Sequence, residues 1–98
     1  MVANVDFNIT YVSDPGHGYL IVTPQQLQAL GLTEDSFSQF SFKNNERNPT
    51  QYALEEDCDA FKLYCQATNL GVTLNITEEY VEDQHAVRGW PPIHSIPF

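Results

Sequence analysis

One continuous stretch of the chain, residues 51–77, decides the fold class. It reads QYALEEDCDAFKLYCQATNLGVTLNIT. The first four residues, 51–54, predict a strand, and residues 55–69 predict the main helix of the protein. After Gly71, a residue that commonly ends helices, apolar and polar residues alternate over 72–77 and predict another strand. The stretch therefore predicts a strand, a helix and a strand in succession.

The predicted main helix carries one apolar stripe, whose members recur at i, i+4, i+7 and i+11: Leu54, Cys58, Phe61 and Cys65. Seven residues of helix separate the two cysteines by ~10 Å along the axis, whereas a disulfide needs Cα atoms within ~7 Å. We therefore expect both thiols to be free and buried, and Phe61 to belong to the core. Free thiols are typical of a reducing compartment.

The N-terminal part of the chain predicts a hairpin followed by a short helix. Residues 5–11 alternate between apolar and polar, a Ser-Asp-Pro-Gly turn covers 13–16, and a second strand covers 19–22. Thr23 as N-cap, with Pro24 after it and Gln26 at the third helical position, predicts a capping box. This helix should end at Gly31.

These elements together predict one α+β domain over residues 1–77. A further strand over about 38–43 completes the order β-β-α-β-β-α-β, which favours a mainly antiparallel sheet of about five strands with helices on one face. Residues 78–98 form an acidic tail that is rich in proline and aromatic residues. We expect this tail to lie extended against the domain or against a partner, because its apolar residues are too many for a free linker.

The charge of the chain restricts its partners. Thirteen acidic residues face four basic ones, for a formal net charge of −9. Such a chain repels nucleic-acid backbones and anionic membranes, so no direct nucleic-acid or membrane binding is expected. A protein with a basic surface is a compatible partner. The N-terminus lacks the basic start and apolar run of a signal peptide, which favours a cytoplasmic location.

The first candidate site is the loop Asp14-Pro15-Gly16-His17-Gly18 with Tyr19 after it. Two glycines flank a histidine, so the loop could present His17 to a ligand while the glycines permit close approach. A plainer interpretation is a turn that requires its glycines and leaves the histidine exposed.

The second candidate site is the acidic run Glu55, Glu56, Asp57 and Asp59. With His17 these carboxylates could bind a divalent cation or a small ligand. Alternatively, they favour the start of the main helix through its dipole, since the regular ligand spacing of an EF-hand is absent. Cys58 beside four acids is a poor nucleophile, because negative charge opposes thiolate formation. No catalytic motif is found, and no cofactor or metal is predicted.

Three segments resemble a known group of sequences: Asp14-Pro15-Gly16-His17-Gly18-Tyr19-Leu20, Phe40-Ser41-Phe42, and the run from Tyr52 to Ala60. The group consists of small uncharacterised proteins encoded by bacteriophages, plasmids and bacterial genomes. Its members have a DPGHGWL-like loop and a Y-x-LEEDCDA-like stretch, and here Tyr19 stands where a Trp is usual. The resemblance covers most of residues 6–70. It implies a mobile-element setting inside a bacterial host, where small acidic proteins often inhibit defence complexes.

The resulting hypothesis is a non-enzymatic, acidic protein-binding module that occupies a basic surface of a host nucleic-acid-handling complex, such as a CRISPR effector. The expected partner-binding residues are the acids of both acidic regions and the tail tryptophan: Glu55, Glu56, Asp57, Asp59, Glu78, Glu79, Glu82, Asp83 and Trp90. The alternatives are the metal- or small-ligand-binding domain built on His17 and the acids 55–59, and a homo-oligomeric structural protein.

Overall fold

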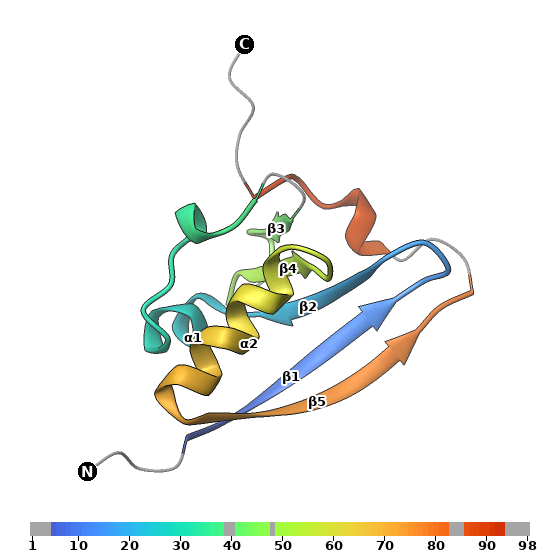
Figure 1. Cartoon of the computed structure of the whole chain (residues 1–98). Coiled ribbons are helices and arrows are strands. Elements are labelled where there is room, and N and C mark those ends of the chain that lie inside the picture. Colours follow the sequence, from blue (N-terminus) through green and yellow to red (C-terminus); the bar gives the residue numbers. More distant parts are fainter. Residues whose placement is uncertain (1–4, 39–40, 48, 83–85, 94–98) are drawn as a thin grey trace.

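The computed structural model describes residues 5–38, 41–47, 49–82 and 86–93 (Figure 1). The elements run in this order: β1 (Val5–Ser13), β2 (Gly18–Val22), α1 (Pro24–Ala29), η1 (Glu34–Ser36), β3 (Phe42–Asn44), β4 (Gln51–Glu55), α2 (Asp59–Leu70), β5 (Val72–Tyr80) and η2 (Ala86–Gly89). The chain is α+β, as predicted, but its order differs by two 3-10 helices, η1 and η2. In the part of the chain that the structure describes, no helix has the length and apolar character needed to cross a membrane.

The five strands form one sheet in the order β3-β4-β2-β1-β5. The prediction of a mainly antiparallel sheet was wrong, because β5 runs parallel to β1 over its whole length, from Val5 opposite Val72 to Ser13 opposite Tyr80. The cause is α2, which carries the chain from β4 past β2 and β1 to the far edge of the sheet (Figure 1). A crossover helix returns the chain to the end where the previous strand began, so the next strand runs parallel to it.

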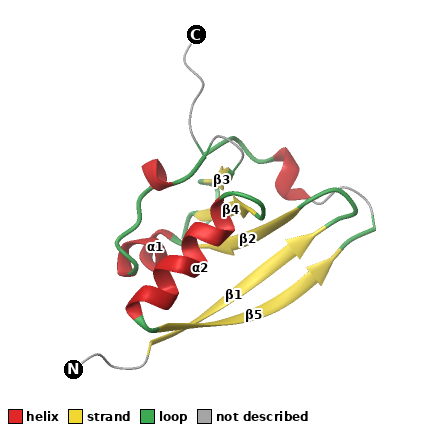
Figure 2. Ribbon diagram, in the orientation of Figure 1, coloured by secondary structure: helices red, strands yellow, loops and turns green. Residues whose placement is uncertain are grey.

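The main core lies between the sheet and the two α-helices, which cover one face of it (Figure 2). Residues of β1, β2 and β4 that point to this face alternate along each strand, as the pleat requires. The buried members of this core are Ile9, Leu20, Val22, Leu27, Leu30, Phe37, Tyr52, Leu54, Ala60, Leu63, Ala67 and Ile93. Val22 and Leu27, which lie on either side of the start of α1, both belong to it.

A smaller core lies on the opposite face of the sheet. It consists of Val12, Tyr19, Ala53 and Val87, and Trp90 packs against it. The region expected as a tail therefore contributes to the packing at two places, since Ile93 is buried in the main core as well. The expected boundary at residue 77 falls within β5, which extends to Tyr80.

The predicted start of α1 is confirmed by the structure. The Thr23 side chain accepts a hydrogen bond from the Gln26 backbone N–H, and the Gln26 side chain accepts one from the Thr23 backbone N–H. This reciprocal pair satisfies two N–H groups that a helix start otherwise leaves without partners.

The predicted start and buried face of α2 were wrong. The helix begins at Asp59 instead of residue 55, and it buries Asp59, Ala60, Leu63 and Ala67. Phe61 is 64% exposed, so it is not a core residue. Both cysteines are free, as predicted, but they are exposed. The predicted stripe fails because Leu54 lies in β4, so the true helical face is offset from the one that begins at Leu54.

Candidate functional site

Asp59 lies inside the fold, and its carboxylate holds the segment before β3. Its side chain is 0% exposed. Asp59 accepts hydrogen bonds from the Ser38 backbone N–H at 3.0 Å, the Ser38 hydroxyl at 2.8 Å and the Ser41 hydroxyl. The Lys62 ammonium lies 3.4 Å from the same carboxylate. A buried carboxylate needs such partners to offset its lost hydration, so Asp59 serves the fold.

Glu55 also acts within the fold. It is 8% exposed, and its Oε2 accepts from the backbone N–H groups of Asp57 at 3.1 Å and Cys58 at 3.0 Å. Those two hydrogen bonds stabilise the turn that precedes α2. The helix therefore begins at Asp59, after this turn. Asp57 itself is exposed. Of the four acids predicted to form one partner-binding surface, Glu55 and Asp59 therefore offer no accessible carboxylate.

Glu56 is intermediate in burial between the buried Glu55 and Asp59 and the exposed Asp57. Its carboxylate lines a cavity that is described below. Its Oε2 accepts a short hydrogen bond from the Tyr11 hydroxyl, from a residue 45 positions earlier in the chain. The Glu56 backbone N–H donates to the Gly18 carbonyl at 3.1 Å. The first hairpin loop thus meets the turn before α2, as the sequence suggested, but through the backbone and Tyr11.

Gly18 is required for this arrangement. A Cβ atom at position 18 would overlap the Tyr11 hydroxyl and lie 2.9 Å from Glu56 Oε2. The absence of a side chain lets the phenol of Tyr11 cross the backbone and reach the carboxylate. This explains one glycine of the predicted loop by packing alone.

The remaining residues of the predicted ligand loop form a turn. The buried Asp14 carboxylate accepts from the backbone N–H groups of Gly16 at 2.9 Å and His17 at 3.0 Å. Tyr19 is buried and packs edge-on against Phe42, with ring centroids 5.6 Å apart. His17 is exposed. Within the described residues, no group of three or more His, Cys, Asp and Glu side chains is arranged to hold a metal ion.

The acids after residue 77 occupy a different place. Glu78 and Glu79 lie on β5 and Glu82 follows it, and all three are exposed. Asp83 lies outside the described residues. Trp90 is half-buried against the smaller core on the opposite face of the sheet. Glu78 points to the helix-covered face of the sheet, since it pairs with Tyr11, and Glu79 points to the other face.

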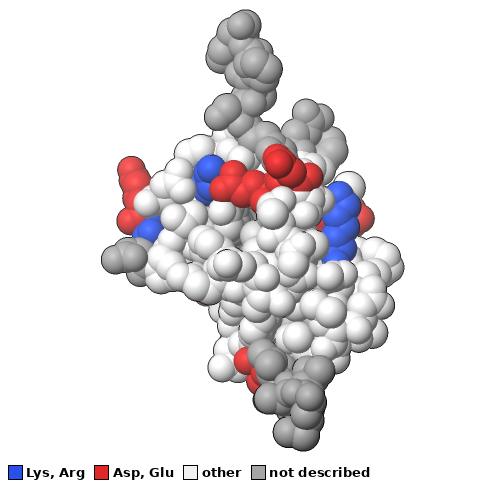
Figure 3. Space-filling model, turned by 90° about the vertical axis from the view of Figure 1, so that its left-hand side faces the viewer, with Lys and Arg blue, Asp and Glu red and all other residues white. Residues whose placement is uncertain are grey.

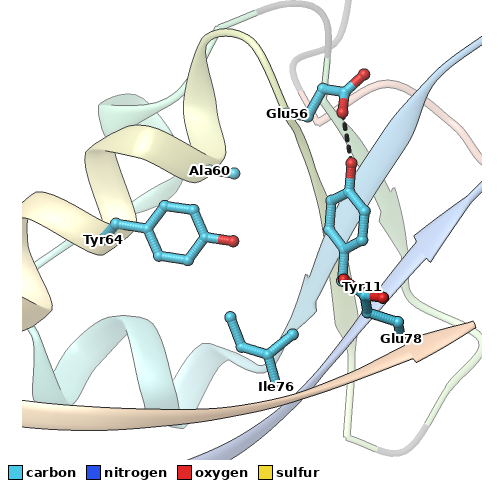
Figure 4. A pocket seen from close by; sticks show the side chains of 6 residues that line it. All are labelled: Tyr11, Glu56, Ala60, Tyr64, Ile76 and Glu78. Carbon is cyan, nitrogen blue, oxygen red and sulfur yellow. Dashed lines mark hydrogen bonds between the residues drawn. The ribbon is translucent and has the colours of Figure 1, made fainter.

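An open cavity of about 640 Å³ lies between α2 and the strands β1 and β5. Six described residues line it: Tyr11, Glu56, Ala60, Tyr64, Ile76 and Glu78. Figure 4 shows the Tyr64 ring projecting from α2 and the Ile76 side chain rising from β5 into the space in front of Tyr11. The described lining combines two phenols, two carboxylates and two aliphatic groups, with no basic residue.

Both phenols of the cavity stay protonated well above neutral pH. Burial and the neighbouring Glu56 carboxylate raise the pKa of Tyr11 far above its ordinary value, and burial raises the pKa of Tyr64. Tyr11 is therefore a permanent donor to Glu56 and fixes that carboxylate against the wall. The negative charge of the cavity comes from Glu56 and Glu78.

The two edge strands of the sheet, β3 and β5, differ in whether another described segment of the chain pairs with their outer side. At β3, the Lys43 backbone N–H donates to the Pro91 carbonyl at 2.8 Å, and Phe42 forms a bridge with Pro92. At the other edge, β5 has nine residues and pairs with β1 on one side, with no described strand on its other side. β5 contains no proline and no lysine, and the charged residues among the commonly protective types that it does carry, Glu78 and Glu79, lie near its C-terminal end.

Among the described residues, the large exposed apolar side chains lie on α2 and β5. They are Phe61, Leu70, Ile76 and Tyr80, which are 64, 44, 40 and 62% exposed. Phe61 lies about 60° around the helix from Tyr64 and is not among the described residues that line the cavity. Tyr11, Tyr64, Ile76 and Tyr80 were not predicted as site residues from the sequence. The alternation of β5, with aromatic and acidic residues at its end, could have indicated Ile76 and Tyr80, but Tyr11 and Tyr64 lie on β1 and α2.

The acidity of the chain is unevenly distributed over the surface. Figure 3 shows the face seen from the left of Figure 1, and most of its described surface is uncharged, with the acidic groups gathered in a few places and basic groups near some of them. Described ion pairs account for part of this pattern, since Lys43 pairs with Glu34 and Lys62 with Asp59. The negative charge is therefore not spread evenly over the face that Figure 3 shows.

Comparison with known proteins found no matching family model, no similar curated protein and no similar solved structure. Within this chain, the segments that carry the phage-protein resemblance contact one another: Ser41 bonds Asp59, and Gly18 bonds Glu56. Their packing roles account for part of that sequence pattern.

Proposed function

We propose that this protein is a non-catalytic binding module that occupies a basic surface of another protein through the exposed edge and helix-facing side of β5. The observation that carries the proposal is the long, open edge strand. It presents Ile76, Glu78 and Tyr80 beside an acidic cavity. An edge strand presents unpaired backbone groups with which another chain can pair, and exposed apolar side chains ringed by polar groups are typical of interfaces.

The charge of the strand favours a cationic partner over another copy of this chain. β5 carries Glu78 and Glu79 and no basic residue, and the whole chain carries a charge of −9. Two such molecules repel each other, whereas a basic surface is attracted and its association is steered. The resemblance to phage and plasmid proteins supplies a setting for this proposal, in which the occupied surface is the nucleic-acid-binding channel of a bacterial defence complex.

Affinity capture from a bacterial lysate tests this proposal when it compares matched variants. The full chain is immobilised, and captured proteins are identified by mass spectrometry at low and moderate salt. The test variant is Ile76→Ser with Tyr80→Ser, and the control is Asp57→Asn, an exposed acid of the turn before α2.

We expect a basic protein that the wild type and the control retain and the β5 variant loses, with retention that weakens as salt rises. Equal retention by the β5 variant, or no protein retained specifically by the wild type, would contradict the proposal. A metal-binding function lacks a supporting cluster in the described residues.

A further inference from the structure

We infer that the cavity between α2 and β5 receives an arginine or lysine side chain, presented by an extended segment of a partner protein that pairs with the open edge of β5. This inference rests on the proposed binding function and names the chemistry of the ligand. It commits to a peptide side chain because two of the described lining residues, Ile76 and Glu78, belong to the edge strand itself.

The lining of the cavity selects a long-chain cation. Glu56 and Glu78 supply two carboxylates, and no basic residue of the described lining neutralises them. Ala60 and Ile76 supply an aliphatic surface for the methylene stem of arginine or lysine. Anions would be repelled by the two carboxylates, and wholly apolar ligands would remove water from them without replacing its hydrogen bonds, which is costly. The volume of about 640 Å³ is within the range of ordinary ligand pockets.

The two tyrosines prepare the site for a cation. The Tyr11 hydroxyl bonds one oxygen of Glu56, which orients the carboxylate while its other oxygen remains available to a donor. The Tyr64 ring projects into the cavity from α2 (Figure 4). A guanidinium or ammonium group beside a tyrosine face is stabilised by the ring quadrupole, and a guanidinium can also bond a carboxylate through two N–H groups.

The position of Glu78 links the cavity to the strand edge. Glu78 pairs with Tyr11 in the parallel ladder, so both side chains lie on the helix-facing side of the sheet. A strand added to the open edge would place side chains about 5 Å from those of β5 on the same face. Glu79 is the neighbouring residue with the same charge, but it lines a separate cavity on the other face with Val12 and Trp90.

The experiment is an NMR titration of the full chain with acetyl-Thr-Val-Arg-Val-Thr-amide. The control peptide replaces arginine by citrulline, which keeps the shape and removes the charge. The test variant is Glu78→Gln and the matched control is Glu79→Gln, since both lose one charge at adjacent positions on opposite faces. Free arginine amide is titrated in parallel, and sedimentation velocity follows the oligomeric state.

We expect saturable shifts at the β5 amides and the Tyr64 ring, and binding of the citrulline peptide that is about tenfold weaker. Glu78→Gln should weaken binding of the arginine peptide about tenfold, and Glu79→Gln should weaken it about twofold or less. Equal effects of the two variants would overturn the cavity assignment. Arginine amide that binds as tightly as the peptide would overturn the role of the strand edge, and a dimer held through β5 would show that a second copy is the occupant.

This result is separable from the test of the proposed function. If the arginine peptide leaves the β5 amides unshifted while Ile76→Ser with Tyr80→Ser still abolishes capture, this inference is wrong and the binding function stands. If β5 substitutions leave capture unchanged, the binding function fails whatever the peptide does.

Discussion

The two edges of the sheet show what this chain protects and what it leaves open. β3 is three residues long, and residues 91–93 cover it through the bond from Lys43 to Pro91 and the bond from Ile93 to Ser41. β5 is three times as long and carries its aromatic and acidic residues in exposed positions. Our proposal is that this long edge strand, with negative charge at its end, is a site for a particular partner.

The acidic residues divide in the same way. Asp59 and Glu55 on the covered side of the fold are buried and bonded to backbone and hydroxyl groups. Glu78 and Glu79 on the open strand are exposed. The same residue type therefore stabilises one region and, under the proposed function, provides charge for recognition in the other. Substitutions in each region should separate loss of stability from loss of binding.

The largest expected effect is at Asp59. Asp59→Ala removes the buried acceptor of Ser38 and Ser41 and should lower the free energy of unfolding by about 3–5 kcal/mol. Asp57→Ala, in the same acidic run but exposed, should change it by about 0.5 kcal/mol or less. Urea unfolding followed by circular dichroism measures both. Similar losses for the two variants would show that burial of Asp59 is unimportant for stability.

The second comparison is between two residues of α2. Leu63→Ala should cost about 2–5 kcal/mol, because Leu63 is 0% exposed in the main core. Phe61→Ala should cost about 1 kcal/mol or less, since most of that ring is in solvent, while retention of the partner falls. Parallel urea unfolding and capture experiments measure the two quantities. A loss of about 3 kcal/mol in the free energy of unfolding for Phe61→Ala would instead support the sequence-based prediction that Phe61 lies in the core.

The third comparison concerns the edges directly. Phe42→Ala on the covered edge should destabilise the protein by about 1–3 kcal/mol, because Phe42 packs against the buried ring of Tyr19. Tyr80→Ala on the open edge should change stability by about 0.5 kcal/mol or less and weaken partner binding about tenfold. Thermal unfolding and a binding isotherm distinguish the outcomes. Strong destabilisation by Tyr80→Ala would mean that β5 is held by packing that its exposure does not reveal.

The smallest effect is expected at the thiols. Both should react with a thiol reagent in the folded protein, because both are exposed. Desolvation and the carboxylates of Glu55 and Asp59 raise the pKa of Cys58, so less thiolate forms at a given pH. In the Cys65→Ser variant, native labelling should therefore be slower than in urea at pH 8, and the difference should narrow as pH rises. Equal labelling rates in the native protein and in urea at pH 8 would contradict a raised pKa of Cys58. No labelling of the native protein at pH 10 would contradict the exposure of its thiol.

The sequence predicted the features of this fold that depend on neighbours in the chain. The capping box of α1 needs only Thr23 and Gln26, and the first hairpin needs only its alternation and turn. The start of α2 was mispredicted because Glu55 bonds the next turn through its side chain, which competes with helix formation. Helical periodicity alone does not determine whether the helix face that contains Phe61 or the face that contains Leu63 is buried.

The candidate site was largely beyond the sequence because it is built from distant residues. Tyr11 and Glu56 are separated by 45 positions, and their contact depends on the missing side chain of Gly18. The parallel pairing of β1 with β5, which brings Glu78 beside Tyr11, follows from the path of α2 across the sheet. The charge of −9 led to the prediction of a cationic partner, but it could not indicate which acids are accessible.

Hydrogen–deuterium exchange of the protein, alone and with its captured partner, tests the central claim most directly. If the partner pairs with the open edge, backbone amides in residues 72–80 should gain protection, while those in 42–44 should stay as they are in the free protein. Protection confined to residues 42–44 and 86–93, with exchange in 72–80 unchanged, would contradict the account and place the interface at the covered edge.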